Sequence, residues 1–363
     1  MNSSSIEEAE LCSSEDEGAD YRRIETIFHS INYALPLCAI AALASNINLL
    51  ICIRRGIRQK RLPIKRYVMT IHRCVSDVVT LLVGFAYSAN EYMNNCDNDH
   101  ICIQSNSSWF SSLLQAIFIL NYWSVALSYA GIAILTYIAV KSPLQYKVHL
   151  RCSVVLKTLG ISWIAMILSF VSCIWLFHDG KLNYHANMVV HLFLDDFDKN
   201  EVHVAIWLVD LCVNIDLQSP YRSALVTLAP PLFFYVVSLV AYCIISVELF
   251  NKRTTNAIKR HKSAMWRLGT HLVFFSITCF LTGFAYYGSL PMEQFCTSQK
   301  LNLNACLEPV VFYTRSTALA VFGWFMRMFF DGLIDVYVDG VLRRRPTKVI
   351  APSMFSLTTN EVR

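Results

Sequence analysis

Apolar residues occur along the chain in seven long blocks, separated by shorter stretches of polar and charged residues. A helix needs about 20 residues to cross the hydrocarbon core of a bilayer, and every block is long enough to do so. Blocks such as "LPLCAIAALASNINLLICI" lack the alternation of polar and apolar positions that a membrane β-barrel requires. The pattern predicts an all-α membrane protein, a seven-transmembrane helix bundle with helices at residues 28–53, 66–92, 108–140, 155–178, 221–250, 265–290 and 309–338.

Composition and chain ends agree with a single membrane domain. Of the 363 residues, 55% are apolar and 16% are charged, whereas a soluble domain has about 25% charged residues. Residues 1–27 are acidic and polar and lack the apolar core of a signal peptide, so we expect a disordered extracellular arm. Residues 28–340 are expected to form the seven-transmembrane domain and residues 341–363 a short cytoplasmic tail.

Charge is distributed unevenly between the two sides of the predicted bundle. Lys and Arg residues in short loops resist translocation and therefore mark the cytoplasmic side. They concentrate in alternate connections and in the tail, for example Arg54, Arg58, Lys141, Arg151, Lys259 and Arg344, while the other connections and the N-terminal arm are acidic. We therefore predict a multi-pass plasma-membrane protein whose N-terminus is outside. Its basic loops would face anionic lipid, and the net charge of +5 gives no argument for nucleic acid.

Several features of the predicted outer side suggest a secreted-type surface. Two glycosylation acceptor motifs begin at Asn2 and Asn106. Six cysteines lie outside, and sequence alone does not choose among their pairings. Proximity along the chain favours a disulfide between Cys296 and Cys306, with Cys212 paired to Cys102 or Cys96. The second outer loop, "MVVHLFLDDFDKNEVHVAIWLV", has two β-rich runs around an acidic turn, which predicts a β-hairpin.

Several motifs occur at matching places along nearly the whole chain. Asn46 lies in "SNINLL" and Asp77 in "CVSDVVTLL", while "LTYIAVKSPLQY" contains Tyr137 and Pro143 and is followed at the expected spacing by Trp163. With these motifs in joint register, the chain resembles the rhodopsin-like (class A) G protein-coupled receptors. The resemblance implies a receptor that binds an extracellular ligand, an odorant-like small molecule or a peptide, and signals through a heterotrimeric G protein. For this chain we predict no cofactor and no metal site.

Other positions depart from the pattern of that family. Leu135 and Thr136 stand where an acid and an arginine are usual, so we expect an altered resting switch at Thr136 and Tyr137. Phe280 replaces a tryptophan in the sixth helix, and the seventh helix has Asp331 through Asp335 in place of an asparagine-proline motif. This divergence resembles the nematode-type chemosensory serpentine receptors.

The resemblance also implies a set of aromatic side chains facing an outer ligand cavity. They are Tyr87, Phe118, Tyr122, Phe284 and Tyr287. Each of them could instead be an ordinary packing residue. Together they would give an apolar cavity with a few hydroxyl groups.

Charged residues within the apolar blocks predict specific contacts. In the family, the acid at the position of Asp77 binds a sodium ion. Arg327 lies one turn before Asp331, and an unpaired charge in the bilayer interior costs at least about 2.5–3.5 kcal/mol. We therefore expect the guanidinium of Arg327 to replace the sodium ion and bridge Asp77 and Asp331, with Arg73 pairing with Asp335. The alternative is a shifted seventh helix whose charges face the inner water layer.

Two other functions can be weighed against a receptor. For an enzyme, the histidines of the second outer loop have no zinc-site spacing, and His72 and His271 stand isolated in their helices without a nucleophile motif. We therefore predict no enzymatic activity. A transporter would explain the intramembrane charge, but the sequence has no duplicated halves. A transporter, or a receptor-like protein that does not signal, remains the alternative.

The predicted Cys296–Cys306 disulfide can be tested directly. A bond closing a small loop contributes about 3 kcal/mol through the unfolded state, so Cys296→Ser should reduce delivery to the cell surface. Mass spectrometry of non-reduced peptides should find the two residues linked. Two free thiols in protein isolated from the surface would contradict the pairing.

Overall fold

A computed structural model describes residues 14–60, 62, 64–95, 108–148, 150–176, 220–251, 255–298 and 308–338. Within these ranges the chain forms eight helices and no strand. They are α1 (Ser14–Arg58), α2 (Ile64–Asn95), α3 (Ser108–Lys141), α4 (Pro143–Val148), α5 (Cys152–Leu176), α8 (Pro220–Asn251), α9 (Thr255–Ser298) and α10 (Glu308–Val338).

Seven of these helices are long and apolar enough to cross a membrane. They coincide with the seven predicted blocks, which confirms an all-helical fold with seven candidate spans. The short helix α4 was not predicted and follows α3 directly. The predicted hairpin and most of the outer loops lie outside the described residues.

The first helix begins earlier than predicted. α1 starts at Ser14, so residues 14–27, which were expected to belong to the disordered arm, are helical. The sequence offers a reason, because Ser14 and Glu17 have the spacing of a capping box and acidic residues near a helix N-terminus are favoured by the helix dipole. The prediction gave weight to polarity and overlooked this start signal.

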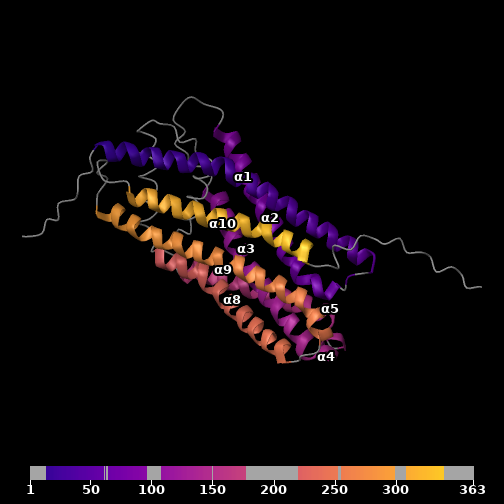
Figure 1. Cartoon of the computed structure of the whole chain (residues 1–363). Helices are drawn as coiled ribbons and strands as arrows, with labels where there is room; N and C mark the ends of the chain where they lie inside the picture. Colours follow the sequence, from indigo (N-terminus) through magenta and orange to yellow (C-terminus); the bar gives the residue numbers. More distant parts are fainter. Residues whose placement is uncertain are drawn as a thin grey trace, which may run out of the picture.

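The helices run lengthwise through the molecule, as Figure 1 shows. α10 packs between α1 and α9, and α3 packs against both α2 and α8. In the most apolar stretch of α3, 61% of the residues are buried inside the bundle, compared with 17% in the corresponding stretches of α5 and α8. α3 is therefore a central helix, while α5 and α8 turn most of their apolar side chains outward.

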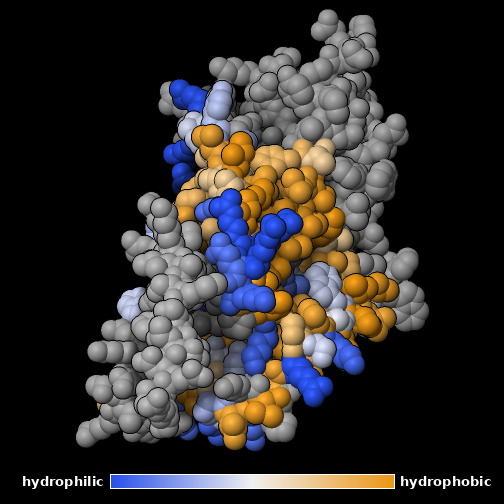
Figure 2. Space-filling model, turned by 90° about the vertical axis from the view of Figure 1, so that its right-hand side faces the viewer, coloured by the Kyte–Doolittle hydropathy of each residue, from blue (hydrophilic) through white to orange (hydrophobic). Residues whose placement is uncertain are grey.

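Figure 2 shows the end of the bundle where α1 and α10 finish and α5 begins. Hydrophilic side chains gather there among apolar ones. Exposed basic residues on the parts of the helices that reach this end are Arg54, Arg55, Arg58, Lys141, Arg151 and Lys157. The described basic residues of the first and third connections thus lie at one end of the bundle.

The close contact between α1 and α10 fixes the position of α10 along the axis of α1. Asn46 Nδ2 donates to the carbonyl of Met328 (3.0 Å) and Ser45 Oγ to that of Phe329 (3.1 Å). Gly332 makes the approach possible, because a Cβ there would lie 3.0 Å from the carbonyl carbon of Ser45. These contacts fix the turn of α10 that carries Arg327 and Asp331.

Candidate functional site

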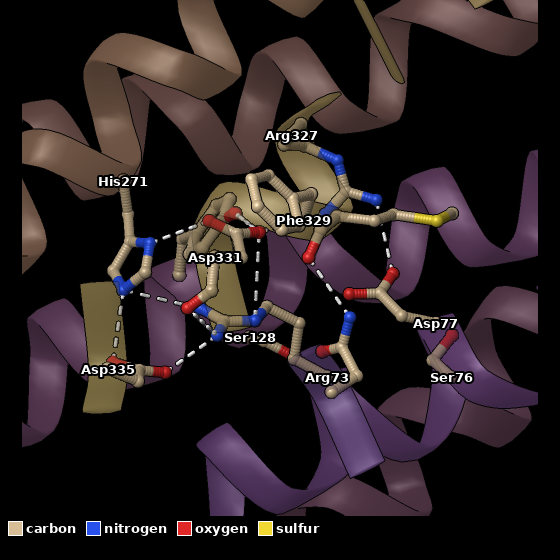
Figure 3. Close-up of polar contacts among 12 residues, drawn as sticks. Arg73, Ser76, Asp77, Ser128, His271, Arg327, Phe329, Asp331 and Asp335 are labelled. Atoms are coloured by element: carbon tan, nitrogen blue, oxygen red, sulfur yellow. Dashed lines mark hydrogen bonds and ion pairs between the residues drawn. The ribbon is translucent and has the colours of Figure 1, made fainter. Parts of the chain in front are cut away.

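A layer of charged side chains lies at the centre of the bundle (Figure 3). The Arg327 guanidinium is fully buried and bridges two helices. Its Nη2 lies 3.1 Å from Asp77 Oδ1 on α2, and its Nη1 lies 3.1 Å from Asp331 Oδ2 on α10. The contacts that the sequence predicted for Arg327 are therefore present, and α10 is not shifted toward the inner water layer.

Asp331 receives donors from three helices. Besides Arg327, the Tyr129 hydroxyl on α3 donates a short hydrogen bond to its Oδ2. His271 Nδ1 on α9 lies 2.6 Å from its Oδ1. In Figure 3 the Asp331 carboxylate lies between the His271 imidazole and the Arg327 guanidinium. Asp331 is thus the point where α3, α9 and α10 meet.

Asp335 forms the second centre of the layer, one turn further along α10. Arg73 Nη2 on α2 donates to its Oδ2 at 2.6 Å, as predicted. Two groups of α9 face its other oxygen, His271 Nε2 at 3.2 Å and Arg267 Nε at 3.4 Å. Arg73 Nε also lies 3.7 Å from Asp331 Oδ2. One helix, α10, therefore binds α2 and α9 through the same carboxylates.

The charges of this layer balance. Three guanidinium groups, from Arg73, Arg267 and Arg327, face three carboxylates, from Asp77, Asp331 and Asp335. All six side chains are at most 5% exposed. Since isolated ions in such a place would be very costly, the pairing is a requirement of the fold.

The structure corrects the interpretation of His271 as an isolated residue. It is completely buried and has Asp331 at one ring nitrogen and Asp335 at the other. Ionised carboxylates only accept hydrogen bonds, so Nδ1 donates to Asp331. Nε2 also lies 3.5 Å from Arg73 Nη1. A neutral ring can accept from Arg73 there, and a charged ring can donate to Asp335, so His271 has partners in both states.

His72 is not isolated either. Trp163 Nε1 on α5 donates to its Nε2 at 2.6 Å, and its Nδ1 lies 2.7 Å from Ser128 Oγ on α3. Because Nε2 accepts, Nδ1 carries the proton and donates to Ser128, whose own hydroxyl donates to the Ser124 carbonyl at 2.8 Å. Trp163 therefore connects α5 to the bundle interior.

A polar chain links this histidine region to the charged layer. Ser124 Oγ lies 2.7 Å from Ser76 Oγ, and Asn121 Nδ2 donates to both Ser76 Oγ and Asp77 Oδ1 at 3.0 Å. Asn121 Oδ1 accepts from Arg327 at 3.5 Å. Hydrogen bonds thus extend from α5 through α3 and α2 to α10.

The aromatic residues proposed to face a ligand do not form one cluster. Phe118 and Tyr122 gather around Trp324 of α10, with ring centroids 4.7 and 5.9 Å away. Tyr122 is only 3% exposed, and its hydroxyl donates to Cys279 Sγ at 2.9 Å. Here Phe118 and Tyr122 pack in the interior between α3, α9 and α10.

The remaining aromatic residues of that set lie elsewhere. Phe284 contacts Phe312, with centroids 5.5 Å apart. Tyr287 is 63% exposed, whereas its neighbour Tyr286 is buried and donates to Thr227 of α8. The side chain of Tyr87 lies outside the described residues.

The aromatic residue that replaces the sixth-helix tryptophan lies on the outer face of α9. Phe280 is 72% exposed on the outside of the bundle. Phe275 of α9 is completely buried and packs against Tyr122, Tyr129 and Tyr235. Phe275 is therefore the aromatic centre of this region.

Near the end of α3, Thr136 bonds within its own helix and Tyr137 contacts the neighbouring helices. Thr136 Oγ1 donates to its own helix at the Ile132 carbonyl (2.7 Å). Tyr137 packs against the apolar cluster that joins α3 to α8 and α9, formed by Val140, Ile245, Leu249 and Met265. Its hydroxyl accepts from Lys141 Nζ at 2.7 Å. Position 136 therefore makes no charged contact among the described residues.

The outer-surface predictions lie outside the part of the chain that the structure describes. Asn2, Asn106, Cys102, Cys212 and Cys306 fall in undescribed segments, and Cys296 is described only as part of the α9 backbone. The pairing and glycosylation therefore stay predictions. The described residues contain no group of three or more His, Cys, Asp or Glu with metal-binding geometry.

Comparison with known proteins adds one relative. No family model matches the chain. It is 45% identical over 333 residues to "Uncharacterized protein ZC21.6" of Caenorhabditis elegans, in an alignment that covers 92% of this chain and 79% of that protein. The chain belongs to the family of this nematode protein. This relationship assigns no activity, so the function is argued from the site.

The bridging role of Arg327 predicts a large loss of stability in Arg327→Met. Removing one partner of a buried ion pair typically costs about 3–5 kcal/mol. This substitution removes the arginine that pairs with Asp77 and one of the two arginines that face Asp331. Thermal unfolding of purified protein in detergent measures the effect. Adding Asp77→Asn should recover part of the loss, because the carboxylate that lost its arginine is replaced by a neutral amide.

The control is Arg151→Met, which removes an exposed arginine at the start of α5. Its effect should stay within about 0.5 kcal/mol. Equal stabilities of the Arg327 and Arg151 variants would contradict the bridge.

Proposed function

We propose that the protein is a plasma-membrane G protein-coupled receptor with its N-terminus outside, which binds an extracellular ligand and signals through a heterotrimeric G protein. The observation that carries the proposal is the joint placement of the receptor-like motif residues. Asn46 and Asp77 are completely buried and bond to α10, and Trp163 bonds into the interior from α5. In this proposal the ligand is an odorant-like molecule or a peptide, and the nematode origin of the relative agrees with the nematode-type chemosensory receptors that the chain resembles.

The charged layer supplies a resting switch in this proposal. Receptors of the resembling family use an arginine near the end of the third helix, and Thr136 makes no such contact here. His271 and Arg267 instead hold α9 to the two carboxylates of α10. Ligand-driven movement of α9 would have to exchange or break these contacts. The basic end of the bundle, with Arg54 and Lys141 exposed, is the surface offered to the G protein and to anionic lipid.

Transport is the alternative function, and the charged layer itself favours it. Buried ionisable side chains inside a membrane are typical of substrate and proton pathways. The layer is, however, charge-balanced, and its side chains are closed off from solvent. A receptor uses such a layer as a set of breakable contacts, whereas a transporter needs access to it from both sides.

Two assays separate these functions. In a cell with a chimeric G protein reporter, screening volatile, small polar and peptide libraries should yield an evoked signal that requires expression of this protein. In sealed vesicles, the same compounds and protons should not accumulate through it. Substrate accumulation in vesicles together with a silent reporter would favour transport and contradict the proposal.

The switch predicts a specific change in basal signalling. His271→Leu removes the imidazole contacts of α9 with Asp331 and Asp335, while Arg267 keeps its contact with Asp335. The active arrangement therefore becomes more accessible, and basal reporter signal, normalised to surface expression, should rise several-fold. Thr136→Ala is the matched control, because its hydroxyl bonds only within its own helix. A rise with Thr136→Ala and none with His271→Leu would place the switch at the end of α3 instead.

A further inference from the structure

A groove with a cavity of about 270 Å³ opens between α1 and α10. α1 contributes Thr26, Ile27, Ser30, Ala34 and Leu35, and α10 contributes Arg315, Ala318, Leu319 and Phe322. Leu35 and Ala318 are buried, while Leu319 and Phe322 are 44% and 39% exposed. The groove therefore has a buried floor and an apolar rim on the outer surface of the bundle. It is separate from the charged layer described above.

The surface of the groove is almost entirely apolar, and the lining residues that carry polar groups gather at one end. α1 and α10 run side by side in the same direction, as the contact of Asn46 with Met328 and Figure 1 show. Thr26, Ser30 and Arg315 therefore lie at the end nearer the helix starts. Ala34, Leu35 and Phe322 lie deeper. A ligand that fits this gradient has a polar head and an apolar chain.

The polar end lies near the boundary of the hydrocarbon core. The 31 residues of α10 span about 46 Å, compared with about 30 Å for the core. Arg315 is seven residues after Glu308, about 10 Å along the axis. Its guanidinium can therefore meet a head group at the interface while Phe322 faces the chain region.

Arg315 is the charged residue of the lining, and its charge has no partner within the described part of the chain. It is exposed and forms no hydrogen bond or ion pair with any described residue. The hydroxyls of Thr26 and Ser30 donate to carbonyls of their own helix. An anionic head group is the chemical complement of this end, because a guanidinium binds carboxylates through charge-assisted hydrogen bonds.

We propose that this groove binds a free fatty acid, with its carboxylate on Arg315 and its alkyl chain along α1 and α10. The cavity is slightly smaller than pockets for drug-sized ligands, about 300–1,000 Å³, so it suits one chain rather than the two of a phospholipid. It also lies at the end of the bundle away from the basic residues that face anionic lipid in the inner leaflet. Binding at this site does not depend on the proposed coupling to a G protein.

Dodecanoic acid is the probe, titrated into purified full-length protein in nanodiscs of neutral phosphatidylcholine at a pH that keeps the acid ionised. Calorimetry or native mass spectrometry measures binding. The acid should bind at least roughly tenfold more tightly than dodecanol, which has the same chain and no charge. Arg315→Gln should remove that preference, and Arg315→Lys should retain most of it.

Two further variants separate the groove from general lipid binding. Ala34→Phe, which fills the groove, should weaken binding of both probes, while Arg151→Gln at the opposite end should change neither. Unchanged thermal unfolding of the probe-free variants shows that they are folded. The proposal would be overturned if the acid and the alcohol bound equally well, or if Arg315→Gln and Arg151→Gln had equal effects. It would also be overturned if phosphatidylglycerol, and not dodecanoic acid, occupied the groove.

Discussion

Three arginine and three aspartate side chains must stay paired at the centre of this helix bundle, because none of them can reach water without moving a helix. That requirement determines how four helices are arranged. α10 carries one arginine and two of the carboxylates, and α2, α3 and α9 each supply a donor to them. The contacts of Asn46 and Ser45 with the α10 backbone keep this turn in register with α1.

Such a layer is better suited to specifying an arrangement than to adding stability. Desolvation of buried ions offsets much of their attraction, so a packed apolar core could be equally stable. However, any shift of one helix along another that leaves a buried charge without its partner is strongly destabilised. His271 adds a second property, since its Nε2 lies between Asp335 and Arg73 and can exchange partners. A two-state contact at the junction of α9 and α10 is the physical basis of the proposed switch.

Sequence reasoning predicted the spans and the pairs made by Arg327 and Arg73, because length, hydropathy and the cost of buried charge leave few choices. It missed the participants whose role depends on packing. His271 and Arg267 are four residues apart and face the same carboxylate, while Asn121, Ser124 and Ser128 form a polar stripe at helical spacing. That periodicity was available in the sequence. The outward position of Phe280 was not, because the rotation of α9 is set by tertiary contacts of Phe275.

The most direct test of the account is a double-mutant cycle between Arg73 and Asp335, using Arg73→Met, Asp335→Leu and the double variant. The coupling free energy is obtained from unfolding in detergent. If the layer holds α2 to α10, the coupling should be at least about 1.5 kcal/mol, as for other close charge pairs. Additive effects within about 0.5 kcal/mol would show that the two residues act independently, and would contradict the central role of the charged layer.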